Sequence, residues 1–244
     1  MVAEVHYAFP TAIFTQQLDN FESINKIFLD NIEPYDFTST GEVLTGEYLG
    51  KISMHHNPLF KDFYKIVSEC ARDYVDFLGM REDIFEYHFT KSWLSIIDKP
   101  TLHMRYHSHS VSDISWVYYV QVPENADAIS FFNKHKPNEL FSGFMDDGRD
   151  SPLDDLYDFT PKGKTFFKER NAANYTTFNV PPQEGMLILF PGKQQHGTIP
   201  HPDATGPQLG KRTAVVGDIN LILKPGHLNF ESGRINNDYM RTFD

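Results

Sequence analysis

The chain has 244 residues, with 22 Lys and Arg against 33 Asp and Glu, and its formal net charge is −11. A nucleic-acid partner needs a basic surface to meet its phosphates, so this charge balance excludes that function class. The one cysteine, Cys70, excludes an internal disulfide, and the lack of any run of about 18 apolar residues excludes a membrane span, so we expect a soluble protein of the cytoplasm.

The first part of the chain predicts one short strand and two helices. The apolar stretch 7–14 favours a strand, and residues 21–32 favour a helix with one apolar side. A longer helix is expected over 58–78, because its apolar residues recur at spacings of three and four. Asn57 is a suitable N-cap for this helix, and Cys70 lies on its apolar stripe as a small core residue.

From residue 85 onward the pattern changes to short strands rich in aromatic and β-branched residues. We therefore expect a mainly β fold with N-terminal helices, in which two sheets form a double-stranded β-helix (a jelly-roll, cupin-like core). A single domain would span 1–244, with 1–84 as strand and helical support and 85–244 as the core. The predicted strands are 85–97, 115–122, 128–132, 174–180, 185–191 and 213–223.

A long insertion, 134–171, separates two of these strands. It mixes acidic residues with aromatic ones, and a purely disordered linker would have few aromatics. Long loops in compact domains often cover a functional site. We expect a mobile cover that packs on the mouth of the barrel and selects the substrate, the alternative being a surface excursion remote from the site.

Three histidines and one arginine are candidates for the chemistry. His107 and His109 precede the strand 115–122 at a two-residue spacing, which places both side chains on one face of an extended backbone. His196 follows the strand 185–191, in what we expect to be a turn, and Arg212 opens the last strand. In a jelly roll these positions meet at the open end of the barrel. Non-haem iron needs three ligands on one side of the ion, and imidazole is a suitable ligand.

The ordered set of residues resembles the 2-oxoglutarate and iron(II)-dependent oxygenases, in a branch found in bacteria and phages. That branch has HxH before S-G-V-Y-Y-V, a Gly-led apolar strand that ends in F-P and precedes a His, and an Arg that opens the last strand. The resemblance spans nearly the whole chain. The matching residues are His107, His109, Ser115, Val117, Tyr118, Tyr119, Val120, Gly185, Phe190, Pro191, His196, Arg212 and Asn220, with Trp93 and the opening FPTAIF.

Two positions depart from the family pattern. Trp116 stands where the family has Gly, and it either crowds its strand or packs on the outer face. His109 stands where the wider superfamily has Asp or Glu, so the resemblance implies an iron site made of His107, His109 and His196. The alternative is that His109 only supports the site and that a carboxylate such as Asp113 reaches the ion.

The resemblance also implies a pocket for 2-oxoglutarate. Arg212 would hold the far carboxylate of this cosubstrate by a two-pronged hydrogen bond. Because alternate residues of a strand share a face, Val117 and Tyr119 would line the pocket together while Tyr118 faces the other way. In the reversed register, Tyr118 takes the place of Tyr119.

These features predict an iron(II)- and 2-oxoglutarate-dependent oxygenase that hydroxylates an unidentified substrate with release of succinate and CO2. The substrate would be a small molecule or a protein side chain, with no nucleic-acid or membrane partner, and a phage protein acting in the host cytoplasm would fit. Two alternatives stay open. A three-histidine dioxygenase of cupin type predicts turnover without 2-oxoglutarate, and a non-catalytic jelly-roll module predicts no stoichiometric metal.

Overall fold

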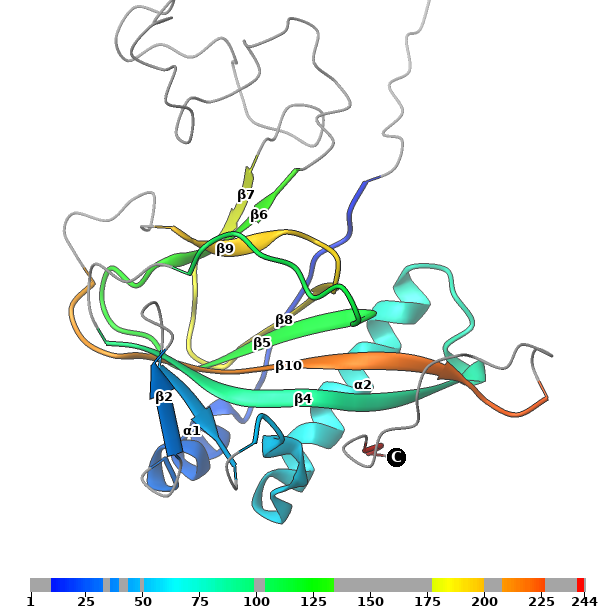
Figure 1. Cartoon of the computed structure of the whole chain (residues 1–244), viewed down its shortest axis with the longest axis horizontal. Helices are drawn as coiled ribbons and strands as arrows, with labels where there is room; N and C mark the ends of the chain where they lie inside the picture. Colours follow the sequence, from blue (N-terminus) through cyan, green and yellow to red (C-terminus); the bar gives the residue numbers. More distant parts are fainter. Residues whose placement is uncertain are drawn as a thin grey trace, which may run out of the picture.

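Two antiparallel sheets face each other at the centre of the fold (Figure 1). In the large sheet the strand order is β1-β8-β5-β10-β4-β3-β2, and in the small sheet it is β7-β6-β9. The strands are β1 (Phe14–Gln17), β2 (Asp36–Ser39), β3 (Leu44–Glu47), β4 (Phe85–Ile97), β5 (Ile114–Gln121), β6 (Ala128–Phe132), β7 (Thr177–Val180), β8 (Met186–Pro191), β9 (His196–Ile199) and β10 (Arg212–Leu223). The computed structural model describes residues 10–32, 36–39, 44–48, 51–98, 104–133, 177–199, 208–226 and 241–243.

The expected jelly-roll core is confirmed, and the N-terminal segment contributes more to it than the sequence indicated. The strand predicted at 7–14 is wrong in position, because β1 begins only at Phe14 and pairs with β8. The strands β2 and β3 were not predicted, and β3 pairs with β4 at the opposite edge of the large sheet. The insertion 134–171, expected to cover the barrel mouth, lies outside the described residues.

Two helices cover the outer face of the large sheet (Figure 1). The first, α1 (Phe21–Asp30), ends two residues earlier than predicted. The second was predicted as one helix over 58–78, but this range is the 3-10 turn η2 (Pro58–Phe60) followed by α2 (Lys61–Phe77). Two further 3-10 turns flank it, η1 (Met54–His56) before and η3 (Glu82–Ile84) after. The Oδ1 atom of Asn57 accepts the N–H of Leu59 at 3.0 Å, so this residue caps the segment as expected. Among the described residues, no helix has the length and apolar character needed to cross a membrane.

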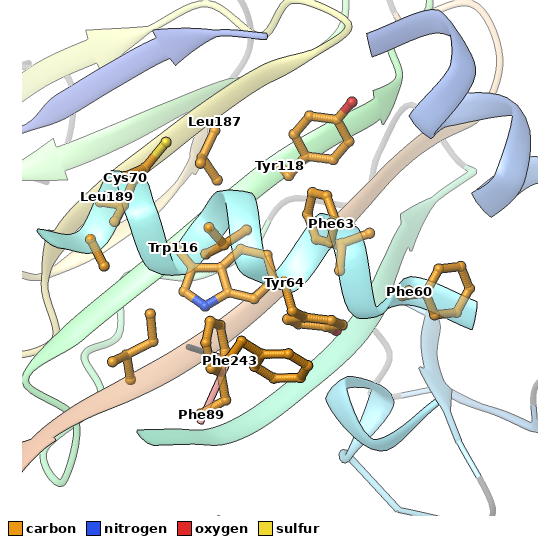
Figure 2. Packing of buried hydrophobic residues seen from close by; sticks show 14 of the residues in the cluster. Phe60, Phe63, Tyr64, Cys70, Phe89, Trp116, Tyr118, Leu187, Leu189 and Phe243 are labelled. Atoms are coloured by element: carbon orange, nitrogen blue, oxygen red, sulfur yellow. The ribbon is translucent and has the colours of Figure 1, made fainter. Parts of the chain in front are cut away.

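Trp116, the departure from the family pattern, packs on this outer face without crowding its strand. Its ring lies 5.9 Å from that of Phe63 and 6.0 Å from that of Tyr64, measured between ring centroids (Figure 2). The residue opposite it on β10 is Gly217, where an added Cβ would lie 2.7 Å from the indole ring. The neighbouring strand therefore makes room for the large side chain, which explains how Trp replaces Gly at this position.

On β5, Val117 and Tyr119 face the interior between the two sheets and Tyr118 faces the helices, which is the first of the two registers considered above. Val117 and Tyr119 belong to the apolar cluster between the two sheets, together with Phe131 and Phe190. Tyr118 points to the helices, and its hydroxyl donates a hydrogen bond to a buried amide of α1 at 2.7 Å. The alternation of side chains along a strand thus assigns Tyr119 to the barrel interior and Tyr118 to the outer core.

We predict that Cys70 is unreactive in the native protein. It lies on the buried side of α2 (Figure 2), and burial raises the pKa of its thiol to about 11, with further increases from the neighbouring charges of Asp73 and Glu69. The thiolate is the reactive form, so at pH 8 about a hundredfold less of it is present than for an ordinary thiol. Labelling with a disulfide reagent should be slow in native protein and rapid in denaturant. Rapid labelling of the native protein would contradict this placement.

Candidate metal centre

Main-chain hydrogen bonds hold the first and the last of the three histidines side by side. The N–H of His107 donates to the carbonyl of His196, and the N–H of His196 donates to the carbonyl of His107, both at 2.9 Å. The expectation that His196 lies in a turn is wrong, because the turn after β8 is already complete and His196 is the first residue of β9. The segment before β5 therefore runs along β9, which brings distant parts of the chain together.

His109 is held to the turn after β8 by a separate bond. Its N–H donates to the carbonyl of Gly192 at 2.7 Å. A Cβ on this glycine would lie only 2.4 Å from the carbonyl oxygen of Ser112, so the close approach of the two segments requires glycine here. The local backbone thus fixes the direction from which the imidazole of His109 enters the site.

The three imidazoles form a compact group. One ring nitrogen of each lies within 4.8 Å of the corresponding atoms of the other two. The ring centroids of His107 and His196 are 4.4 Å apart, and each lies 5.3 Å from that of His109. Three nitrogen donors at these separations are close enough to bind one ion, and imidazole is a suitable ligand for iron.

The hydrogen bonds of the rings indicate which nitrogen would bind a metal. His107 directs Nδ1 to the carbonyl oxygen of Arg105, and His196 directs Nδ1 to that of Gln194, both at 2.9 Å. A carbonyl oxygen only accepts, so Nδ1 must carry the proton in both neutral rings. The lone pair then belongs to Nε2, which is the nitrogen that a metal would bind.

The surroundings of His196 favour its neutral form. The side chain is buried, and its ring centroid lies 4.6 Å from that of Phe190. Burial lowers the pKa of His196 to about 3 against the opposing hydrogen bond to Gln194, and charge on His107 or His109 would lower it further. Metals bind neutral imidazole, so this ligand needs no deprotonation at neutral pH.

His109 has a different kind of partner, which sequence reasoning missed. Its Nδ1 lies 2.5 Å from Oδ1 of Asp218, a buried residue of β10, and the hydroxyl of Ser115 donates to the same oxygen at 2.7 Å. Trp93, on β4, stacks on the other side, with ring centroids 6.3 Å apart. The sequence did contain one signal for this contact. Asp218 is a carboxylate within the apolar strand 212–223, and a buried acid needs a specific partner.

Asp113, the alternative carboxylate ligand, is occupied elsewhere. Its Oδ2 accepts the main-chain N–H of Leu221 at 2.8 Å, and its own N–H donates to the carbonyl of Ile219 at 3.2 Å. These bonds join the start of β5 to β10. Among the described residues, the group of possible ligands contains the three histidines and does not include Asp113.

Arg212 is a buried cation in the barrel interior. It is 4% exposed, and its Nη1 donates to the carbonyl of Asp127 at 2.8 Å. The buried Nε meets no hydrogen-bond acceptor among the described residues. Burial lowers the pKa of Arg212, while Tyr119 and Asp127 oppose that shift. A buried cation with an unused donor is suited to an anionic ligand such as a carboxylate.

The remaining two residues predicted for the cosubstrate lie near this arginine or in the same interior. The guanidinium carbon of Arg212 lies 5.9 Å from the centre of the Tyr119 ring. Burial raises the pKa of Tyr119, so its hydroxyl keeps its proton and can donate a hydrogen bond. Val117 lies two residues before Tyr119 on the same face of β5, and it is buried in the same apolar cluster. Along β10, the residues between Arg212 and Asp218 that face this interior are Ala214 and Val216.

Comparisons with known proteins bear on the family and on the fold. Residues 91–206 match the family described as "Putative 2OG-Fe(II) oxygenase", and no curated protein matches the chain. HygX from Streptomyces hygroscopicus, solved with nickel, 2-oxoglutarate and hygromycin B bound, is similar with a TM-score of 0.52 at 11% identity, over 86% of this chain and 83% of that chain. A prolyl-4-hydroxylase from Pseudomonas putida has a TM-score of 0.50 at 11% identity, over 86% and 92%. Both structures share the fold.

Proposed function

We propose that the chain is a 2-oxoglutarate and iron(II)-dependent oxygenase, the family that its residues 91–206 match, that His107, His109 and His196 hold its iron(II), and that Arg212 binds its 2-oxoglutarate. The observation that supports this proposal best is the group of three imidazole nitrogens within 4.8 Å of one another. The tautomers favoured by the Nδ1 hydrogen bonds leave Nε2 as the donor atom, and neutral nitrogen donors suit iron(II).

The cosubstrate site follows from the buried cation. The far carboxylate of 2-oxoglutarate would accept hydrogen bonds from the guanidinium of Arg212, whose Nε has no acceptor among the described residues. The Tyr119 hydroxyl would donate a hydrogen bond to the same carboxylate, and Val117 would pack against the carbon chain. The surrounding apolar cluster excludes water, which strengthens these charged hydrogen bonds.

The reaction is a hydroxylation. Iron(II) and 2-oxoglutarate, when bound, would supply oxidising chemistry in which one oxygen atom of O2 is used to convert 2-oxoglutarate to succinate and CO2 and the other is inserted into a C–H bond of the substrate. The chain contributes the imidazoles that hold the ion, the arginine that orients the cosubstrate and the apolar wall that keeps the site dry. We propose a small molecule or a protein side chain as the substrate class, because one similar structure contains hygromycin B and another is a prolyl-4-hydroxylase.

The wild-type protein tests this function directly. We expect one iron(II) per chain and formation of succinate from 2-oxoglutarate that requires both iron(II) and O2. Zinc in place of iron is the matched control, because it occupies nitrogen sites but performs no redox chemistry. Metal binding without any binding of 2-oxoglutarate would favour the three-histidine dioxygenase instead. Failure to bind metal in stoichiometric amounts would leave a non-catalytic jelly-roll module.

A further inference from the structure

We propose that Asp218 is a positioning residue that supplies, through His109, the negative charge that a site with three neutral imidazole ligands lacks. The inference rests on the proposed function, because it assumes that the three histidines bind a divalent metal. The observation behind it does not depend on that assumption: the buried carboxylate of Asp218 is in hydrogen-bond contact with the ring of His109.

The three histidines differ in what holds their Nδ1 atoms. For His107 and His196 the acceptor is a neutral main-chain carbonyl two residues earlier, at Arg105 and Gln194 respectively. These contacts are local and carry no charge. His109 instead reaches an acceptor that is 109 residues away along the chain and ionisable. A carboxylate fixes the tautomer as a carbonyl does, but it differs from the two carbonyls in the negative charge that it can bring to the ring.

The fold holds this carboxylate in place before any metal binds. Asp218 and Ser115 are direct partners in the pairing of β10 with β5, so their side chains point to the same inner face. The Ser115 hydroxyl donates to Oδ1 of Asp218 at 2.7 Å, and His109 contacts the same oxygen. Asp218 is 2% exposed, so water contributes little to its solvation. Its position is therefore set by two side chains and by the strand register.

A buried carboxylate is costly unless opposite charge or hydrogen bonds compensate it. A divalent ion on the far nitrogen of His109 provides that charge, and the carboxylate in return makes the imidazole a stronger electron donor to the metal. The two charges thus stabilise each other across one ring. If Asp218 were only a structural link between strands, its removal would change the stability of the sheet but not the electronic properties of the ion.

The test compares Asp218→Asn with the wild type and with Asp113→Asn. Asn has the size of Asp and still accepts a hydrogen bond, but it lacks the charge. Asp113 is a matched control, because it is also a carboxylate bonded to β10 but is not part of the histidine group. We expect Asp218→Asn to bind cobalt(II) at least about tenfold more weakly, as is typical of outer partners of a metal ligand, and to shift the midpoint potential of bound iron to a more positive value. Asp113→Asn should change neither quantity.

A smaller loss of cobalt affinity, or an unshifted iron potential, would overturn the role of Asp218 while leaving the proposed function intact. Absence of metal binding by the wild type would instead overturn the proposed function itself. If Asp218→Asn does not fold, nitrogen NMR of the zinc-loaded wild type decides the matter. We expect His109 to bind zinc through Nε2 and to keep a proton on Nδ1, and binding through Nδ1 would overturn the inference.

Discussion

Replacing His196 by alanine is expected to abolish stoichiometric iron(II) binding and the formation of succinate. The loss of affinity should exceed about 100-fold, since even outer partners of a metal ligand typically cost 10 to 100-fold. His196 is the most buried of the three histidines and is neutral at neutral pH, so the wild-type ligand is ready to bind without losing a proton. Titration with cobalt(II) or iron(II) under anaerobic conditions measures the effect.

The result needs two controls, because removal of a buried ring also affects packing. His107→Ala should have the same effect at a less buried position. His88→Ala removes a histidine of β4 that contacts Glu86 and is not a member of the histidine group, so it should bind metal like the wild type. Circular dichroism and thermal unfolding check that each variant is folded. Wild-type affinity in either His107→Ala or His196→Ala would show that the metal site is misplaced.

Replacing Arg212 by lysine is expected to weaken the binding of 2-oxoglutarate while metal binding stays intact. Lysine keeps the positive charge but loses the planar fork that matches a carboxylate. A hydrogen bond to a charged group contributes about 1.5–3 kcal/mol, so we expect the Kd for 2-oxoglutarate to rise roughly 10- to 100-fold. Calorimetric titration of the nickel-loaded protein measures this without turnover.

The neighbouring Lys211 is the matched control for this variant. It is exposed and carries the same charge one residue away, so Lys211→Ala tests whether positive charge in general attracts the cosubstrate. We expect Lys211→Ala to bind 2-oxoglutarate like the wild type. Unchanged affinity of Arg212→Lys for 2-oxoglutarate would contradict this prediction and favour a three-histidine dioxygenase that does not use 2-oxoglutarate.

The candidate site could be predicted in part, because some of its signals are local. The two-residue spacing of His107 and His109 and the apolar strand before His196 are visible in the sequence, and the structure brings these three residues together. Asp218 was missed, because its contact with His109 depends on the pairing of β10 with β5 and not on any local pattern. For the same reason the sequence offered Asp113 as the alternative carboxylate, although its oxygen is bonded to the main chain of β10.

By itself, the sequence determined the elements that have strong local patterns. The existence of β4 and of α2 follows from their apolar patterns, and Asn57 marks the start of η2, the turn that precedes α2. Only the tertiary structure decided which strands pair, including the edge strand β2, its neighbour β3 and the strand β9 that begins at His196. Strand pairing joins residues far apart in the chain, and its free energy comes from hydrogen bonds and packing that no short window of sequence contains.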